Sequence, residues 1–152
     1  ALFEACAVIG AKASKASESD VEAARLFGQR IGIIFQIRDD IFDYYDSTEI
    51  GKPTGNDMLE GKLTLPVIYA LRSTGNKEMM ALAMKVKEGT VNADEIAQLV
   101  AFAKESGGIE YAEKKMLEFH SEALQFVSNC VHNEAIACAL KAYLDFVIQR
   151  KN

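Results

Sequence analysis

Apolar residues recur every three or four positions along most of this chain, which is the period of an amphipathic helix. The first such segment, ALFEACAVIGAKAS, covers residues 1 to about 14. The second runs from Ser19 to about Tyr45, and Ser19 with Glu22 has the form of a capping box, with Ser19 as the N-cap. The pattern therefore predicts a short helix followed by a long one.

The rest of the chain repeats the helical period. Residues 47 to 62 contain three glycines and a proline, so we expect this segment to be a loop. A short helix is expected from Thr64, with Pro66 tolerated in its first turn. Asparagines are expected to cap the later helices: Asn76, Asn92 and Asn133. No segment alternates as a strand does, so the predicted fold class is all-α, with six or seven helices.

Composition narrows the class of protein. The chain has 152 residues, of which 49% are hydrophobic and 26% charged, as in a single folded domain. The net charge of -5 argues against nucleic acid as the main partner. Without a long apolar run or a signal peptide we expect no transmembrane segment. The three cysteines lie among apolar residues, which predicts buried thiols and a cytoplasmic protein: Cys6, Cys130 and Cys138.

An acidic cluster interrupts the second helix, in the stretch FQIRDDIFDYYD. Gln36, Asp39 and Asp43 share one helical face, and Asp40 stands beside them. Each like-charge pair one turn apart costs about 0.2–0.5 kcal/mol when exposed. A bound cation would offset this cost. With no histidine or thiolate nearby, the carboxylates suit Mg²⁺, or Mn²⁺ as the alternative, and they predict a metal site at Asp39, Asp40 and Asp43.

The loop that follows carries lysines suited to phosphate. Lys52 and Lys62 each come directly after a glycine, and glycine lets backbone N–H groups approach a phosphate closely. Asp57 is a candidate for orienting a lysine or a metal-bound water. An acidic metal site followed by a Gly/Lys loop indicates recognition of a metal-bridged diphosphate. The plainer alternatives are a solvated acidic face and ordinary loop lysines.

Taken together, these motifs resemble one family closely. The run GIIFQIRDDIFDYYDSTEIGKPTGNDMLEGKLTLPVIYAL is similar to the second aspartate-rich region of the trans-isoprenyl diphosphate synthases. The family pattern is roughly FQ-x-x-DD-x-x-D, GK-x-x-G-x-D and GK-x-T-x-P, and each element is present. The GKLTLP ending resembles that of bacterial medium- and long-chain polyprenyl synthases such as octaprenyl diphosphate synthase.

The resemblance implies a fold, a reaction and roles for residues. The fold would be an isoprenoid-synthase-type helical bundle, and the reaction a Mg²⁺-assisted head-to-tail condensation of isopentenyl diphosphate with an allylic diphosphate. Asp39, Asp40, Asp43 and Lys52 would be catalytic. The substrate-binding residues would be Gln36, Lys52, Lys62 and Phe35, with Phe35 beside the prenyl chain or, alternatively, in the core. Family members are usually homodimers.

Only one of the two aspartate-rich motifs of the family occurs in this sequence. We therefore expect residues 1–152 to be the C-terminal portion of a single polyprenyl synthase domain without its N-terminal half, and to be inactive alone. A non-catalytic subunit of a heteromeric synthase is the alternative, although such a subunit would not need DDIFD and both GK elements. A terpene cyclase fits less well, because cyclases usually carry an Asn/Ser/Glu-type second metal motif. A bare metal-binding helical bundle is the last alternative.

Overall fold

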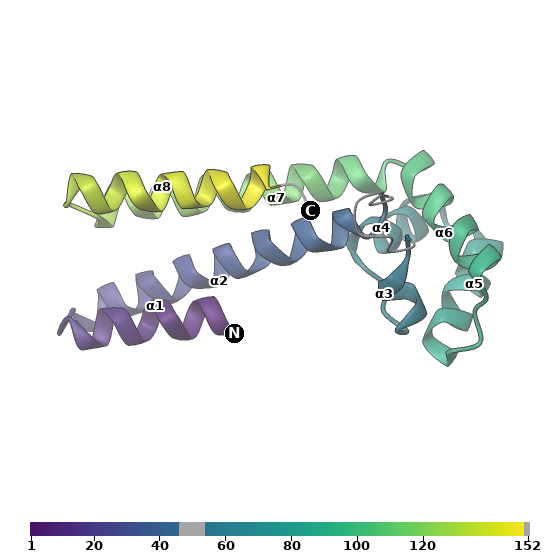
Figure 1. The fold of residues 1–152 in the computed structure, drawn as a ribbon, viewed down its shortest axis with the longest axis horizontal. Coiled ribbons are helices and arrows are strands. Elements are labelled where there is room, and N and C mark those ends of the chain that lie inside the picture. Colours follow the sequence, from purple (N-terminus) through teal and green to yellow (C-terminus); the bar gives the residue numbers. More distant parts are fainter. Residues whose placement is uncertain (46–53, 151–152) are drawn as a thin grey trace. The chain divides into compact units, whose positions relative to one another are not determined.

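The computed structural model describes residues 1–45 and 54–150, which contain eight α-helices and no strand (Figure 1). The predicted all-α class is confirmed. The bounds of the helices are α1 Leu2–Ala13, α2 Glu18–Phe42, α3 Asn56–Leu59, α4 Leu65–Thr74, α5 Lys77–Glu88, α6 Ala93–Glu105, α7 Gly108–Cys130 and α8 Glu134–Gln149. The one-turn helix α3 lies in the segment that was expected to be a loop. The end of α2 differs from its expected position by three residues, because the helix stops at Phe42 rather than near Tyr45.

The chain divides into two compact units, and the boundaries fall inside α2 and α7. Of the described residues, the first unit holds 1–38 and 115–150, and the second holds 39–45 and 54–114. Each unit has its own buried apolar core, as described below. The predicted acidic cluster therefore begins at the first residue of the second unit.

The core of the first unit is built around α2. This helix buries an apolar stripe that includes Ile31, Ile34 and Ile37, and Leu144 of α8 is buried in the same unit. The N-terminal helix α1 lies against α2 at Gly28, where an added Cβ would come within 2.6 Å of the Phe3 carbonyl oxygen. Only glycine allows so close an approach of two helix backbones. The position of α1 on α2 thus depends on the absence of a side chain at Gly28.

The core of the second unit is formed by the helices α3, α4, α5 and α6 together with the start of α7. Fully buried apolar side chains come from each of these helices, and they include Met58, Val67, Val86, Leu99 and Ala112. Close packing is again set by a glycine. A Cβ on Gly108 would lie 2.4 Å from the Pro66 carbonyl oxygen, so the first residue of α7 is pressed against α4.

Three of the four predicted N-caps are confirmed. The side chains of Asn76, Asn92 and Asn133 accept hydrogen bonds from the first turns of α5, α6 and α8, and Asn92 forms a full capping box with Glu95. The prediction of Ser19 as the cap of α2 is wrong. The backbone N–H of Asp20 donates to Ser17 Oγ at 3.2 Å instead, so the helix begins two residues earlier.

The prediction of buried thiols is also wrong, since Cys6, Cys130 and Cys138 are all exposed. Apolar neighbours in the sequence bury a residue only where another element packs on that face. In α1, which carries Cys6, no residue is buried. Within residues 1–45 and 54–150, no helix has the length and apolar character needed to cross a bilayer.

Candidate diphosphate and metal site

The aspartates lie where a helix tolerates negative charge least. Asp39 and Asp40 occupy the last turn of α2, and that turn contains no basic residue. The C-terminal end of a helix carries partial negative charge from unpaired carbonyl groups. Both carboxylates are half-buried, which weakens the screening by water. The free-energy cost of placing these like charges close together is therefore higher than the sequence alone indicates, because they lie at the end of the helix.

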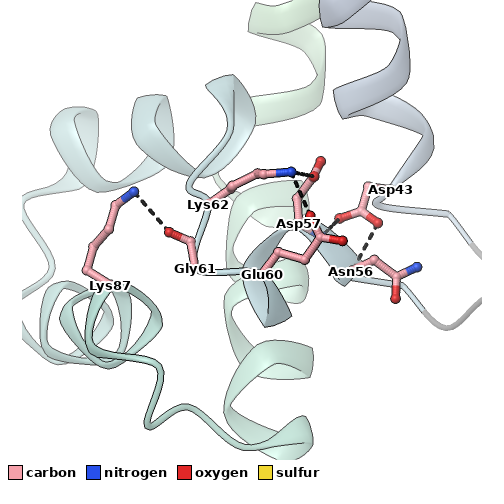
Figure 2. Close-up of polar contacts among 7 residues, drawn as sticks. All are labelled: Asp43, Asn56, Asp57, Glu60, Gly61, Lys62 and Lys87. Carbon is pink, nitrogen blue, oxygen red and sulfur yellow. Dashed lines mark hydrogen bonds and ion pairs between the residues drawn. The ribbon is translucent and has the colours of Figure 1, made fainter.

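Asp43 follows the end of α2 and is bound to the start of α3 (Figure 2). One oxygen of its carboxylate accepts the backbone N–H of Asn56 at 2.9 Å, and the other accepts the N–H of Asp57 at 3.1 Å. Its backbone carbonyl oxygen also accepts the N–H of Gly55 at 2.9 Å. These N–H groups would otherwise be unpaired at the beginning of a helix. Asp43 therefore acts as the N-terminal cap of α3.

Burial is the main cause that raises the pKa of Asp43 above its ordinary value. The negative charges of Asp57 and Glu60 act in the same direction, while the hydrogen bonds from the backbone of α3 oppose it. The surroundings thus disfavour the negative charge of the Asp43 carboxylate, although the carboxylate accepts two backbone hydrogen bonds. A cation at this position would offset that cost.

Gly55 makes the turn into α3 possible. Its φ of +81° is in the left-handed region, and a Cβ there would lie 2.3 Å from Ile96 Cγ2. A side chain would be strained in this conformation and would also collide with α6. Gly55 is the second glycine of the GK-x-x-G-x-D motif, so there is a steric reason for glycine at this position of the motif.

Lys62 is in contact with the acidic residues of the same turn (Figure 2). Its Nζ lies 2.6 Å from a carboxylate oxygen of Glu60 and 3.7 Å from Asp57 Oδ1. The hydrogen bond to Glu60 is the main cause that raises the pKa of Lys62. The backbone before it is fixed as well, since Lys87 Nζ donates to the Gly61 carbonyl oxygen at 3.0 Å. Lys62 is exposed and fully charged, as a phosphate ligand must be.

Of the predicted site residues, the second unit brings together Asp43, Asp57 and Lys62, with Asp39 and Asp40 one turn earlier in α2. Phe35 and Gln36 belong to the first unit, where Gln36 is exposed and the Phe35 ring lies 5.5 Å from that of Phe3. Lys52 lies outside the described residues. The alternatives for Phe35 both remain open, because its side chain is half-buried.

Tyr44, which directly follows Asp43, is not on the helix surface but belongs to the core of the second unit. Its side chain is only 1% exposed. The hydroxyl group is hydrogen-bonded to Thr64 Oγ1 at 3.0 Å and accepts the backbone N–H of Val67 at 3.3 Å. The spacing of Ile37, Ile41 and Tyr44 continues the buried stripe of α2, which is the signal in the sequence that identifies it.

The donor set fits a hard divalent cation, since it consists of carboxylates without histidine or thiolate. Across residues 1–45 and 54–150, no three Asp, Glu, His or Cys side chains gather closely enough to hold a metal ion by themselves. Magnesium in proteins often uses only one or two carboxylates and completes its shell with water and substrate phosphates. Asp39 and Asp40, in the last turn of α2, are the candidates for this role.

Several known proteins resemble this chain in sequence and in fold. A geranylfarnesyl diphosphate synthase of Aeropyrum pernix is 33% identical over 99% of this chain and 46% of its own length. The crystal structure of a geranylgeranyl pyrophosphate synthase from Bacteroides thetaiotaomicron matches with a TM-score of 0.92 and 50% identity, over 98% of this chain and 49% of that one. A second crystal structure is that of a geranylgeranyl pyrophosphate synthase from Corynebacterium glutamicum, complexed with isoprenyl diphosphate and magnesium. It matches with a TM-score of 0.74 and 25% identity, over 93% of this chain and 41% of that one.

The chain thus spans about half the length of the relatives it matches. The family model described as polyprenyl synthetase matches residues 1–103, which is more than half of the sequence. These residues include α1, α2, the acidic cluster and the Lys62 turn. The chain belongs to the polyprenyl synthetase family, the trans-isoprenyl diphosphate synthases.

Proposed function

We propose that this chain is the diphosphate-binding C-terminal portion of a trans-prenyltransferase that condenses isopentenyl diphosphate with an allylic diphosphate. One observation carries the proposal. Asp43 holds the start of α3 through the N–H groups of Asn56 and Asp57, and Asp57 in turn lies 3.7 Å from Lys62. The end of α2, with its candidate metal ligands, and the candidate phosphate ligand Lys62 are therefore linked within one compact unit, which supports the proposal.

In the proposed reaction the bond between C1 and oxygen of the allylic diphosphate breaks, and its electron pair leaves with the diphosphate. The double bond of isopentenyl diphosphate then attacks C1 through its C4, and loss of a proton from C2 restores a double bond. Bound Mg²⁺ would supply positive charge to the departing diphosphate. Asp39 and Asp40 would hold this ion, and Lys62 would hold the diphosphate by exchanging its contact with Glu60.

Asp43 has a narrower role than the sequence suggested. Both of its oxygens accept backbone N–H groups, so we assign it to positioning the Lys62 turn, with any contact to metal made through its remaining lone pairs. Gln36 and Lys52 stay candidates for contact with the diphosphate, and Phe35 for contact with the prenyl chain. We further propose that the whole protein is a cytoplasmic homodimer.

The decisive test is metal-dependent binding of diphosphate by the 152-residue chain. We expect farnesyl diphosphate to bind in the presence of Mg²⁺ and to lose most of its affinity with EDTA, as measured by calorimetry. The change Asp39→Ala should abolish the Mg²⁺-dependent part while leaving the helicity by circular dichroism unchanged. Glu113→Ala, which removes an exposed carboxylate from α7 in the same unit, should bind normally. Equal affinity in EDTA and Mg²⁺ would refute the proposal.

A second test concerns turnover. Only one of the two aspartate motifs of the family is in this sequence. We therefore predict that the chain alone does not convert labelled isopentenyl diphosphate and farnesyl diphosphate into longer products. Catalysis of this kind relies on placing charge on both sides of the leaving group. Chromatography of the labelled products measures this directly. Formation of a longer prenyl diphosphate by the purified chain would contradict the expectation.

A further inference from the structure

The side chain of Arg150, the last described residue, contacts α2. It is the C-cap of α8, where the backbone turns out of the helix, and its N–H donates to the Phe146 carbonyl oxygen at 2.8 Å. Its guanidinium carbon lies 4.0 Å from the centroid of the Phe35 ring. Its Nη2 donates to the Phe35 backbone carbonyl oxygen at 3.1 Å.

Arg38 completes the contact in the opposite direction. Its Nη2 and Nε donate to the Arg150 carbonyl oxygen at 3.0 and 3.3 Å. Each arginine therefore donates to a backbone carbonyl group of the other helix. All three residues belong to the first compact unit, and Arg38 directly precedes Asp39 in the sequence. We name this set of contacts between Phe35, Arg38 and Arg150 the arginine latch.

The chemistry of the latch is specific to arginine. A planar guanidinium can lie over an aromatic ring and donate to a carbonyl oxygen at the same time, which an ammonium group does less well. At the other end, the carbonyl groups that finish α8 carry partial negative charge and lack partners within the helix. The Arg38 guanidinium donates to the carbonyl oxygen of Arg150, directly after the helix, and places a positive charge near that end. The contacts are partly buried, so water competes for them less than at the surface.

We propose that Arg150 is a positioning residue that holds the Phe35 side chain and the turn of α2 before Asp39. It does not touch the acidic cluster in this role; it acts through Phe35 and Arg38. The consequence for ligand binding rests on the proposed function, in which Phe35 contacts the prenyl chain of the substrate. Loss of the latch should then weaken binding of the prenyl chain and spare binding of the diphosphate.

The structural part is tested by amide hydrogen exchange on the chain itself. In Arg150→Ala we expect residues 35–39 and the last turn of α8 to exchange about tenfold faster than in the wild type, which corresponds to about 1.4 kcal/mol. Arg150→Lys should restore only part of the protection, because it lacks the planar group. Lys141→Ala, which removes an exposed cation from the same helix, should exchange like the wild type. Wild-type protection in Arg150→Ala would overturn the proposal.

The functional part compares two probes, farnesyl diphosphate and inorganic diphosphate, each with Mg²⁺. Arg150→Ala and Phe35→Leu should both weaken farnesyl diphosphate by about tenfold and leave inorganic diphosphate unchanged. An equal loss for both probes would overturn the positioning role. If the wild-type chain binds neither probe, the proposed function fails, and the exchange experiment alone decides whether the latch exists. Should Arg150→Ala fail to fold, Arg150→Lys provides the comparison, because it keeps the positive charge but loses the planar group that lies over the Phe35 ring.

Discussion

Replacing Tyr44 by phenylalanine removes a single oxygen atom from the core of the second unit. That oxygen accepts the N–H of Val67, the third residue of α4, and is hydrogen-bonded to the hydroxyl of Thr64. The side chain of Thr64, although it precedes the helix, makes no cap of its own. The first turn of α4 is therefore capped from outside by a tyrosine that lies more than twenty residues earlier in the sequence.

The size of the effect follows from burial. Tyr44 is 1% exposed and Val67 is fully buried, so water cannot take the place of the lost hydroxyl without opening the core. A buried N–H left without an acceptor costs about 1–3 kcal/mol. With a urea dependence of about 1–3 kcal/mol per molar, the unfolding midpoint of Tyr44→Phe should fall by roughly 1 M.

The assay is urea denaturation followed by circular dichroism, with Tyr45→Phe as the matched control. Tyr45 is adjacent in sequence but 50% exposed, and its substitution should change the free energy of unfolding by less than about 0.5 kcal/mol. Thr64→Val completes a double-mutant cycle with Tyr44→Phe and should show coupling between the two hydroxyls. Equal effects at Tyr44 and Tyr45 would show that the hydroxyl does not cap α4.

Two further predictions use the same assay. Burial is the main cause that raises the pKa of Tyr44 above its ordinary value of 10.0. The stability that depends on the neutral hydroxyl is therefore complete below pH 10.0 and is lost as the pH rises through the higher pKa of the folded state. The urea midpoint should fall in alkaline buffer, and it should fall less in Tyr44→Phe. Gly28→Ala should destabilise by about 1–3 kcal/mol because its Cβ would lie 2.6 Å from the Phe3 carbonyl oxygen. Gly32→Ala, whose Cβ would meet only the Phe3 side chain at 3.6 Å, should be neutral or slightly stabilising; a reversed order of the two would contradict the packing of α1 on α2.

The helix starts show how far local chemistry determines structure. Asn76, Asn92 and Asn133 were identifiable because each cap is a hydrogen bond to an N–H two or three residues away. The start of α2 was predicted at Ser19, but Ser17 Oγ accepts the backbone N–H of Asp20 and is the cap. Beyond its first turn, α2 is also bound to α1 by the ion pair between Arg25 and Glu4. The local sequence at the start of α2 contains no information about that contact.

The candidate site was predictable in its residue types but not in its geometry. The spacing of Asp39, Asp40 and Asp43 predicted that Asp39 and Asp43 share one face of a helix with Asp40 beside them, and it suggested a metal site at these three residues. In the structure Asp43 lies beyond the end of α2 and accepts N–H groups from residues 56 and 57. Those donors become available only because Gly55 adopts a left-handed turn. Helical periodicity describes one element, whereas the role of Asp43 depends on a second element.

The caps at the end of α2 also explain how an aspartate motif and a distant Gly/Lys turn can form one site. Asp43 caps α3 and the next residue, Tyr44, caps α4. Lys62 lies between these two helices, so the segment that carries it is held at both ends by adjacent residues of the chain. A shift in the end of α2 would displace both caps and move Lys62 with them. The helix that concentrates negative charge at Asp39 and Asp40 therefore also fixes the position of the lysine, so the metal-bridged diphosphate that we propose would meet both kinds of charge within one unit.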